Sequence, residues 1–331
     1  MTEKLYFCDE LNNTLALFHE GIRACCSGHD GPFYLSPYKN EKIIKENFLN
    51  YKNSFFSLLT EENIYKSKCQ NCFFLREKKQ TDFVSAKYKM LHISHWTHCN
   101  CGCIYCARMQ NSKGIITTKK QKSEYYDILP VIKQLYKQDL LDKDNLEVCI
   151  QGGDISVLKE FEPMIKEFLK KGIKKFNILS NNIVYQPIIR KLLELRKANF
   201  MTSLDCGCAE TYRKLKRVDK FEDCINNLKK YAKGFDYPPI CIKYIVIEHI
   251  NDNIEEIDKF INLVSSLGIN SVEFMIDNKW SLFADLEKTP FPKHYIELYE
   301  FFKKSCKEKN LNLTIWNKLE NDLIKQSKNK V

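Results

Sequence analysis

The stretch Met90-Leu-His-Ile-Ser-His-Trp-Thr-His-Cys99-Asn-Cys-Gly-Cys103-Ile-Tyr-Cys106 joins a short apolar run to a loop with three regularly spaced cysteines. The apolar run has the length of a strand, and Cys99, Cys103 and Cys106 follow it in the order C-x3-C-x2-C. Three thiolates on one short loop can hold three corners of a cubane iron–sulfur cluster. Because the spacing supplies no fourth cysteine, it predicts a cluster with one iron open to a small molecule.

Zinc is the main alternative for this loop, because zinc also binds cysteine and histidine. His95 and His98 lie close to the cysteines, but zinc sites usually contain separated C-x2-C pairs. A cysteine cluster without a metal is a weaker alternative, since thiols this dense in a reducing compartment are typical of metal binding. We interpret Cys101, the extra thiol inside the loop, as a residue that binds no metal.

The composition describes a chain long enough for one large domain and one small one. Its 331 residues are 44% hydrophobic, which is ample for a sizeable core. The N-terminus lacks a continuous apolar segment before a small-residue cleavage site, so it does not resemble a secretory signal. The apolar run Ile242–Ile247 is too short to span a bilayer. We therefore expect a cytoplasmic protein without a membrane partner, in which fifteen reduced cysteines indicate metal binding.

The net charge of +10 comes from 52 basic and 42 acidic residues that are mixed along the chain. Mixed-sign stretches such as Lys166–Lys175 are typical of solvated helix surfaces. The sequence contains no RNA-recognition sheet motif and no compact basic helix. The charge pattern therefore does not favour a nucleic-acid partner.

From Lys89 onward, apolar runs of strand length alternate with amphipathic stretches of helix length. This alternation predicts an α/β fold, a parallel barrel in which functional residues follow the C-terminal ends of the strands. The expected strands are Met90–Ile93, Leu146–Ile150, Lys175–Leu179, Phe200–Leu204, Ile240–Ile247 and Ser271–Met275, with a further one at Leu311–Ile315. The expected helices are Lys122–Lys137, Leu158–Lys171, Gln186–Lys197, Phe221–Ala232, Ile254–Leu267 and His294–Glu308.

Residues 1–80 break this alternation and are predicted to form a small cysteine-rich N-terminal module. The polar stretch Arg76–Asp82 separates this module from a barrel over residues 85–331. The module contains Cys8, Cys26, Cys69 and Cys72. Four thiolates without a histidine can bind a second iron–sulfur cluster. A four-cysteine zinc site is the alternative, because spacing alone does not separate zinc from iron–sulfur.

The three-cysteine loop, with Asn100 after its first cysteine and Tyr105 before its last, resembles that of the radical S-adenosylmethionine (radical SAM) superfamily. The resemblance implies a partial TIM-type barrel of six βα units, (βα)6, which agrees with the strands expected above. It also implies that the open iron of a [4Fe–4S] cluster binds S-adenosylmethionine. One electron then cleaves this molecule to methionine and a 5′-deoxyadenosyl radical, which abstracts hydrogen from a substrate C–H bond.

A diglycine after the second expected strand is similar to the family's Gly-Gly-Glu motif, which holds the methionine amine of the cofactor. Gly152, Gly153 and Asp154 occupy these positions. Two glycines allow the backbone to approach a ligand closely, and the adjacent acid offers an acceptor for an ammonium group. Asp154 has a shorter reach than the family's glutamate but keeps the carboxylate.

The end of the fourth expected strand is similar to the family's Ser-x-Asp strand end and the Tyr-x-x-x-Arg segment that follows it. The resemblance implies that Ser203 contacts the cofactor and that a cation at Lys216 or Arg217 pairs with its carboxylate. The family arginine falls on Lys216 by spacing, and lysine cannot make the bidentate contact of arginine. The aromatic Tyr105 is included among the cofactor-binding residues, whereas no catalytic acid or base is identified.

Three further groups of residues face the expected active-site end of the barrel. Ser180-Asn181-Asn182 either donates to the ribose or the substrate, or caps a helix. Lys243 alternates with apolar neighbours, so one face of its strand can project polar groups into the barrel. Cys206 and Cys208 follow the fourth strand, where either thiol is a weak candidate for a functional role.

The N-terminal cysteines resemble the auxiliary-cluster modules called SPASM and twitch, in which a cysteine, a glycine and a second cysteine precede a C-x2-C pair. Here the pattern is Cys8-x12-Gly21-x4-Cys26, followed by Cys69 and Cys72. The module normally follows the barrel but precedes it here, and the cysteines of a further cluster are missing. The resemblance therefore implies at most one auxiliary cluster, with Cys25 as a rival of Cys26.

These features together predict a radical SAM enzyme that oxidises or modifies a peptide or protein side chain. Radical dehydrogenation of a sugar or small alcohol is the alternative substrate class. A zinc-stabilised binding protein without catalysis is the alternative from another class. The enzyme is expected to need an electron donor, such as a flavodoxin or a ferredoxin, and a peptide or small-molecule substrate.

Overall fold

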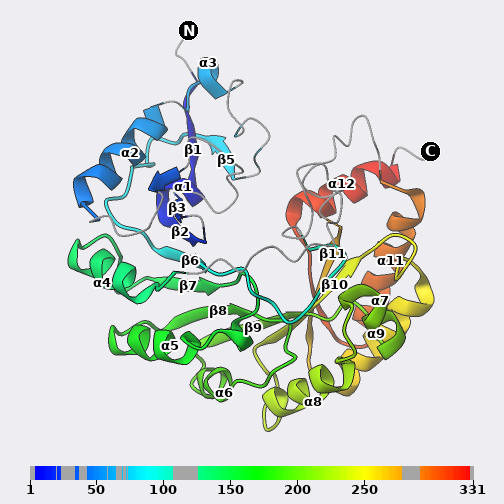
Figure 1. The fold of residues 1–331 in the computed structure, drawn as a ribbon. Helices are drawn as coiled ribbons and strands as arrows, with labels where there is room; N and C mark the ends of the chain where they lie inside the picture. Colours follow the sequence, from blue (N-terminus) through cyan, green and yellow to red (C-terminus); the bar gives the residue numbers. More distant parts are fainter. Residues whose placement is uncertain are drawn as a thin grey trace. The chain divides into compact units, whose positions relative to one another are not determined.

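Figure 1 shows the computed structural model of the chain, which describes residues 4–19, 21–23, 34–36, 43–57, 59–64, 69, 72, 74–106, 126–277 and 291–328. The chain divides into two compact units, and neither is continuous in sequence. The first unit contains Met1–His98, Ser123–Gly153 and Glu160–Asn177, and the second contains Cys99–Lys122, Asp154–Lys159 and Ile178–Val331. This division differs from the expected boundary near residues 80–85, which stays a prediction.

A sheet with the strand order β7-β6-β2-β3-β4 forms the frame of the first unit. Its strands are β2 (Thr14–Phe18), β3 (Gly21–Arg23), β4 (Tyr34–Ser36), β6 (Met90–Ser94) and β7 (Glu147–Ile150). β6 runs parallel to both β2 and β7, with Leu91 in register with Leu15 and Val148. These three residues are fully buried. β6, the strand that leads to the cysteine loop, is therefore a central strand that is buried between apolar neighbours.

A second, small sheet in the first unit pairs β1 (Tyr6–Cys8) with β5 (Leu75–Glu77) in antiparallel register. The helices α1 (Asp9–Asn13), α2 (Lys45–Ser57) and α3 (Glu61–Ile64) belong to the same region. Cys8, Leu11, Phe55 and Leu59 form its apolar core. Two further helices of the first unit, α4 (Leu129–Lys137) and α5 (Phe161–Lys170), are amphipathic, and Phe168 of α5 packs edge-on against Phe176.

The second unit is built on parallel strands in the order β8-β9-β10-β11-β12. Its strands are β8 (Lys175–Leu179, which begins in the first unit), β9 (Ala198–Ser203), β10 (Ile240–Val246), β11 (Ser271–Ile276) and β12 (Asn312–Thr314). Its helices are α6 (Pro187–Glu194), α7 (Ala209–Lys216), α8 (Phe221–Ala232), α9 (Ile254–Ser266), α11 (Lys293–Glu308) and α12 (Asn317–Lys328), with a 3-10 turn at Ile155–Val157. Tyr244 of β10 packs against Phe260 of α9 and Phe302 of α11, so these helices cover one face of the sheet.

The fold is therefore α/β with a mostly parallel sheet, as the alternation in the sequence predicts, and it is consistent with a partial TIM-type barrel. The strand at Lys175–Leu179 and the helix at Phe221–Ala232 have the expected bounds. Both segments combine a clear periodicity with a well-marked end. Within the described residues, the helices are too short or too polar to cross a membrane.

Candidate functional site

Two backbone hydrogen bonds attach the cysteine loop to the end of α7 in the second unit. The amides of Gly102 and Ile104 donate to the carbonyl oxygens of Lys216 and Leu215, each over 3.0 Å. Carbonyl oxygens in the last turn of a helix accept no hydrogen bond within the helix, so they can accept one from a neighbouring segment. The amide of Cys106 closes a turn on the carbonyl of Cys103 at 3.2 Å. The loop is thus held to α7 through backbone contacts.

A buried ion pair lies beneath this loop. The side chains of Lys216 and Asp205 are 2% and 0% exposed, and the ammonium contacts the carboxylate directly. The hydroxyl of Tyr105 contacts both groups, so the loop contributes the third member. Burial is the largest single influence and opposes the charge on Lys216, but the attraction of Asp205 and of Cys103, with the hydrogen bond to Asp205, together raise the pKa of Lys216. The loop is therefore linked to β9 and α7 through charge-assisted hydrogen bonds.

Asp205 is itself fixed by the strand next to it. It follows β9 with a φ of 64°, and its carboxylate accepts a hydrogen bond from the amide of Ile245 at 2.9 Å. The side-chain amide of the fully buried Asn251 donates to the carbonyls of Asp205 and Ile245 at 2.7 and 2.9 Å. Asn251 was not identified from the sequence, because a single asparagine in a loop carries no distinctive pattern.

The carboxylate of Asp154 is also buried, with 1% of the residue exposed. It accepts hydrogen bonds from the amide of Ser156 at 2.8 Å, the hydroxyl of Ser180 at 3.0 Å and the amide of Asn181 at 2.6 Å, and it also contacts the Ser156 hydroxyl. Burial raises the pKa of Asp154, although these hydrogen bonds oppose the shift. Asp154 therefore joins the 3-10 turn to the end of β8. Its predicted contact with the cofactor amine stays a prediction.

Gly152 and Gly153 lie in the first unit, against the backbone that leads to the cysteine loop. A Cβ atom on Gly153 would lie 1.9 Å from the carbonyl oxygen of His98. Gly152 has a φ of 141°, and a Cβ there would lie 3.2 Å from the carbonyl oxygen of Trp96. Only glycine fits this close approach of two backbone segments. The diglycine thus has a packing role, and its contact with a cofactor stays a prediction.

Asn181 directs its side-chain amide at the cysteine loop. The amide nitrogen donates to the side-chain oxygen of Asn100, and it lies 3.3 Å from the sulfur of Cys101 and 3.6 Å from the sulfur of Cys99. The side-chain oxygen of Asn181 accepts a hydrogen bond from the amide of Ile183 at 3.1 Å, which fixes the orientation of the group. Asn181 is thus a donor to cysteine sulfur, a role that its place in a Ser-Asn-Asn turn did not indicate.

The electrostatics of the loop favour thiolates at two of the three predicted ligands. A hydrogen bond from Cys101 and the positive charge of Lys216 lower the pKa of Cys103 to about 6. A hydrogen bond from Cys101 also lowers the pKa of Cys99, whereas the pKa of Cys101 itself is raised. Iron binds the thiolate form of cysteine. This donor set, with Cys106 on the same turn, fits an iron–sulfur cluster.

The sulfurs are not arranged for a single ion. No group of three or more His, Cys, Asp or Glu side chains in the described part of the chain converges on one metal position. Each thiolate of a cubane binds a different iron, so its ligands do not meet at one point. His95 is fully buried, with its ring edge-on to those of Trp96 and Tyr126. The choice between a cluster and zinc at this loop stays a prediction.

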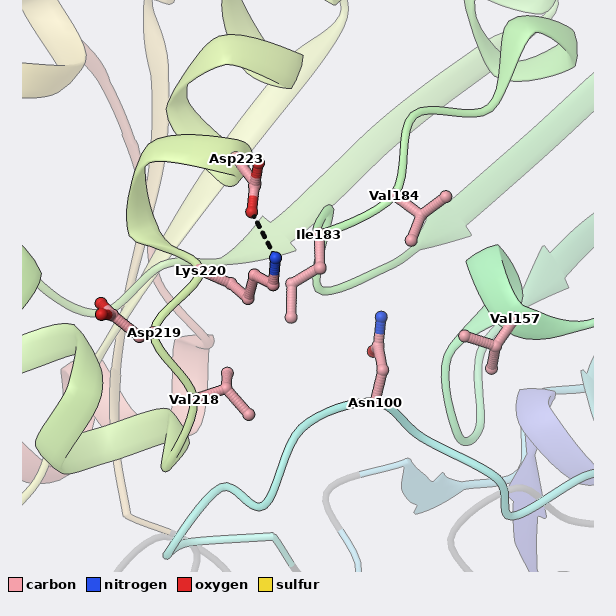
Figure 2. Close-up of a pocket in the computed structure, with 8 residues that line it drawn as sticks. All are labelled: Asn100, Val157, Ile183, Val184, Val218, Asp219, Lys220 and Asp223. Atoms are coloured by element: carbon pink, nitrogen blue, oxygen red, sulfur yellow. Dashed lines mark ion pairs between the residues drawn. The ribbon is translucent and has the colours of Figure 1, made fainter.

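A pocket of about 740 Å³ lies beside the cysteine loop in the second unit (Figure 2). Figure 2 shows Asn100 pointing into it from the loop, opposite Ile183 and Val184. An ion pair of 3.0 Å between Lys220 and Asp223 lines another side. The remaining lining residues are Val157, Val218 and Asp219. The volume is in the range of small-molecule binding sites.

The two cations predicted to pair with the cofactor carboxylate lie in different environments. Lys216 is buried against Asp205, and its ammonium also donates to the carbonyl of Ser203 at 2.5 Å. Arg217 is exposed and ends α7 with a φ of 56°. Ser203 ends β9 and is partly buried. The roles of these residues toward the cofactor stay predictions.

Cys206 and Cys208 differ in exposure. Cys206 is fully buried, and burial raises the pKa of its thiol. It donates to the carbonyl of Leu204 at 3.3 Å. The thiol of the partly buried Cys208 donates to the hydroxyl of Thr211 over the same distance. Both thiols therefore have local partners close to the strand end.

The predicted auxiliary-cluster cysteines lie together in the first unit as far as it is described. Cys69 packs against the core that contains Cys8. The amide of Cys72 donates to the carbonyl of Cys69 at 2.9 Å, and Leu75, which follows this turn, is in register with Cys8. Cys25 and Cys26 lie outside the described residues. The four-cysteine site stays a prediction.

Three known proteins are similar to this chain in sequence or in fold. The worm protein "Molybdenum cofactor biosynthesis protein moc-5" (Caenorhabditis elegans) is 27% identical over 198 residues, 59% of this chain and 31% of that protein. A "Probable GTP 3′,8-cyclase" of Saccharolobus islandicus is 25% identical over 182 residues, 54% of each chain. Streptococcus suis SuiB, solved with its precursor peptide SuiA, superposes with a TM-score of 0.51 at 14% identity, covering 85% of this chain and 57% of SuiB.

The chain thus spans about half or less of the length of these two curated relatives, and the likeness to SuiB concerns the fold alone. The family model of the radical SAM superfamily matches residues 93–263, which include the cysteine loop, the diglycine, Ser203 and Lys216. The chain belongs to the radical SAM superfamily.

Proposed function

We propose that Cys99, Cys103 and Cys106 hold a [4Fe–4S] cluster whose open iron binds S-adenosylmethionine. When bound, such a cluster supplies the electron that cleaves S-adenosylmethionine, and the resulting 5′-deoxyadenosyl radical abstracts hydrogen from a substrate C–H bond. The observation that carries this proposal is the loop with its three cysteines. The pKa values of Cys99 and Cys103 are lowered, and a pocket of small-molecule size lies beside the loop.

The residues around the loop have separate tasks in this proposal. The buried pair of Lys216 and Asp205 holds Tyr105 and with it the last turn of the loop. Asn181 donates hydrogen bonds toward the cysteine sulfurs. Asp154 fixes the backbone of Asn181. Together they keep the loop in one conformation, so that the cofactor and the substrate are positioned and water is excluded.

We further propose that Cys8, Cys26, Cys69 and Cys72 bind an auxiliary iron–sulfur cluster. The proposal is supported by the shared core of Cys8 and Cys69 and by the turn that joins Cys69 to Cys72. Such a cluster would take up the electron that a net oxidation of the substrate releases. The first cluster needs an external reductant, for which a flavodoxin or a ferredoxin is the proposed partner.

Removal of Cys69 and Cys72 tests the auxiliary cluster. We expect Cys69→Ala with Cys72→Ala to remove about four irons per chain from anaerobically reconstituted protein, the content of one cubane. Cys306→Ala, which changes a buried cysteine of α11, is the matched control and should keep the full iron content. Zinc instead of iron in the parent protein, found by elemental analysis, would leave the site structural.

For the substrate, we propose a peptide or protein side chain. SuiB, which has a similar fold over 57% of its chain, was solved bound to a precursor peptide. A nucleotide substrate is the second candidate, because the relative named as a GTP 3′,8-cyclase is more similar in sequence than SuiB. Stimulation of 5′-deoxyadenosine formation above the substrate-free level, by pooled peptides or by GTP, separates the two. Stimulation by GTP alone would contradict the peptide proposal.

A further inference from the structure

Four polar residues form one row across adjacent strands of the second unit. Lys243 of β10 is in register with Ser203 of β9 and with Glu273 of β11, and Glu273 is in register with Thr314 of β12. Residues in register on parallel strands project from the same face of a sheet. The row therefore presents a hydroxyl, an ammonium, a carboxylate and a second hydroxyl side by side.

This row lies on the face opposite the helices. Phe274, the neighbour of Glu273 in β11, packs against Tyr299 and Phe302 of α11. Tyr244, the neighbour of Lys243 in β10, packs against the same Phe302 and against α9. Successive side chains of a strand point to opposite faces, so Lys243 and Glu273 point to the inner face of the barrel.

The partly buried Lys243 and the buried Glu273 form an ion pair with unused hydrogen-bonding capacity. The ammonium lies 3.2 Å from Oε2 of Glu273, and the two side chains are 15% and 5% exposed. Among the described residues, Oε2 accepts no well-aligned hydrogen bond, and the ammonium has one charged contact for its three donors. Two charges in a low-dielectric interior are costly unless further hydrogen bonds satisfy them. The pair thus keeps donors and an acceptor for a further polar group.

The row also adjoins the residues that hold the cysteine loop. The carbonyl of Lys243 accepts a hydrogen bond from the amide of Asp205 at 3.2 Å, and the carbonyl of Ser203 accepts one from Lys216. Asp205 and Lys216 form the buried pair beneath Tyr105. A molecule bound to the row would therefore lie next to the machinery that holds the cofactor loop, where a substrate belongs.

We propose that Lys243 and Glu273 bind two adjacent backbone amides of a peptide substrate. The ammonium donates to the oxygen of one amide, and the carboxylate accepts the N–H of the next amide along the peptide, so two adjacent amides complete both partners. A phosphate or carboxylate would be repelled by Glu273, and an ammonium by Lys243. This inference rests on the proposed function and names the substrate chemistry of the same site.

Saturation-transfer NMR on the full-length chain tests the pair directly. The probes are N-acetylalanine N-methylamide, methyl glucoside and inorganic phosphate at equal concentration. We expect saturation of the amide probe by the parent protein and at least a tenfold loss in Lys243→Met and Glu273→Gln. Lys243→Arg keeps a donor beside the carboxylate and should restore binding. The exposed pair of Lys214 and Glu210 on α7 supplies the matched control, Lys214→Met, with parent-like binding.

Equal saturation of the amide probe in the parent and in both loss variants would overturn the inference, as would saturation of the glucoside or phosphate alone. Glu273→Gln is isosteric and keeps the test valid if Lys243→Met does not fold, which its thermal unfolding shows. The proposed function fails separately, if the parent protein forms no 5′-deoxyadenosine from S-adenosylmethionine without any probe. Amide binding by such a protein would leave the inference about the pair standing.

Discussion

Lys216 and Asp205 form an ion pair that is almost completely buried, and Tyr105 of the cysteine loop is hydrogen-bonded to both of them. A buried ion pair gains little stability over apolar residues of the same size, but the loss of one partner leaves a buried charge uncompensated. The pair is therefore better suited to fix the position of Tyr105 than to add stability. It connects a loop of the cofactor site to β9 and α7.

Removal of one partner of this pair should make the protein less stable. We expect Lys216→Met and Asp205→Asn each to lower the free energy of unfolding of the apoprotein by about 3–5 kcal/mol. Denaturant titration followed by circular dichroism measures this change. Lys214→Met removes an exposed partner of Glu210 on the same helix and should change little. Equal effects of Lys216→Met and Lys214→Met would show that the buried pair is not special.

Asn181 should influence the reduction potential of the cluster. N–H donors near cluster sulfurs stabilise the more negative, reduced state. We therefore expect Asn181→Ala to make the midpoint potential more negative, as measured by redox titration with electron paramagnetic resonance. Asn262→Ala, which removes an exposed amide on α9 that contacts Asp258, is the matched control. An unchanged potential in Asn181→Ala would show that Asn181 only packs against the loop.

Gly153, beside the cysteine loop, and Gly102, inside it, should respond differently to substitution by alanine. Gly153→Ala places a Cβ 1.9 Å from a backbone carbonyl oxygen, so we expect a loss of about 3 kcal/mol in unfolding free energy. A Cβ on Gly102 meets its nearest atom at 3.5 Å, an ordinary contact. Gly102→Ala should therefore stay within about 1 kcal/mol of the parent. A mild effect at Gly153 would contradict the close backbone approach.

His95 should make the apoprotein sensitive to acid. Burial lowers the pKa of His95 from 6.5 to about 3, so the unfolded chain binds the proton more tightly between these values. Stability is therefore unaffected above about pH 6.5 and falls as the pH decreases, by about 2 kcal/mol at pH 5. Between pH 6.5 and pH 5 the parent should lose this much more unfolding free energy than His95→Gln. His249→Gln, which changes an exposed histidine, is the control and should behave like the parent. The same acid dependence in all three proteins would contradict the assignment.

The sequence predicted the fold class and the cysteine loop, because both depend on local patterns. Alternating strands and helices can be recognised in β8 and α8, whose bounds agree with the prediction. The strand β2 (Thr14–Phe18) was not predicted, because it lies outside the alternation of strands and helices and its parallel partner β6 lies more than seventy residues away.

Contacts between distant residues could not be predicted in the same way. Nothing in the sequence joins Tyr105 to Asp205, or Lys243 to Glu273, because each pair forms only when strands far apart in sequence become neighbours. The positions of Asp154 and Lys216 were identified, but their buried partners were not. Short-range spacing thus locates a motif, whereas tertiary packing decides which atoms surround it.

The central claim is that Cys99, Cys103 and Cys106 hold the cluster that cleaves S-adenosylmethionine. Its most direct test is the amount of 5′-deoxyadenosine formed by anaerobically reconstituted protein with dithionite, in the parent, in Cys306→Ala and in the triple variant Cys99→Ala, Cys103→Ala, Cys106→Ala. We predict product from the parent and from Cys306→Ala, and none from the triple variant, which also lacks about four irons. Product formation by the triple variant at the parent rate would contradict the claim.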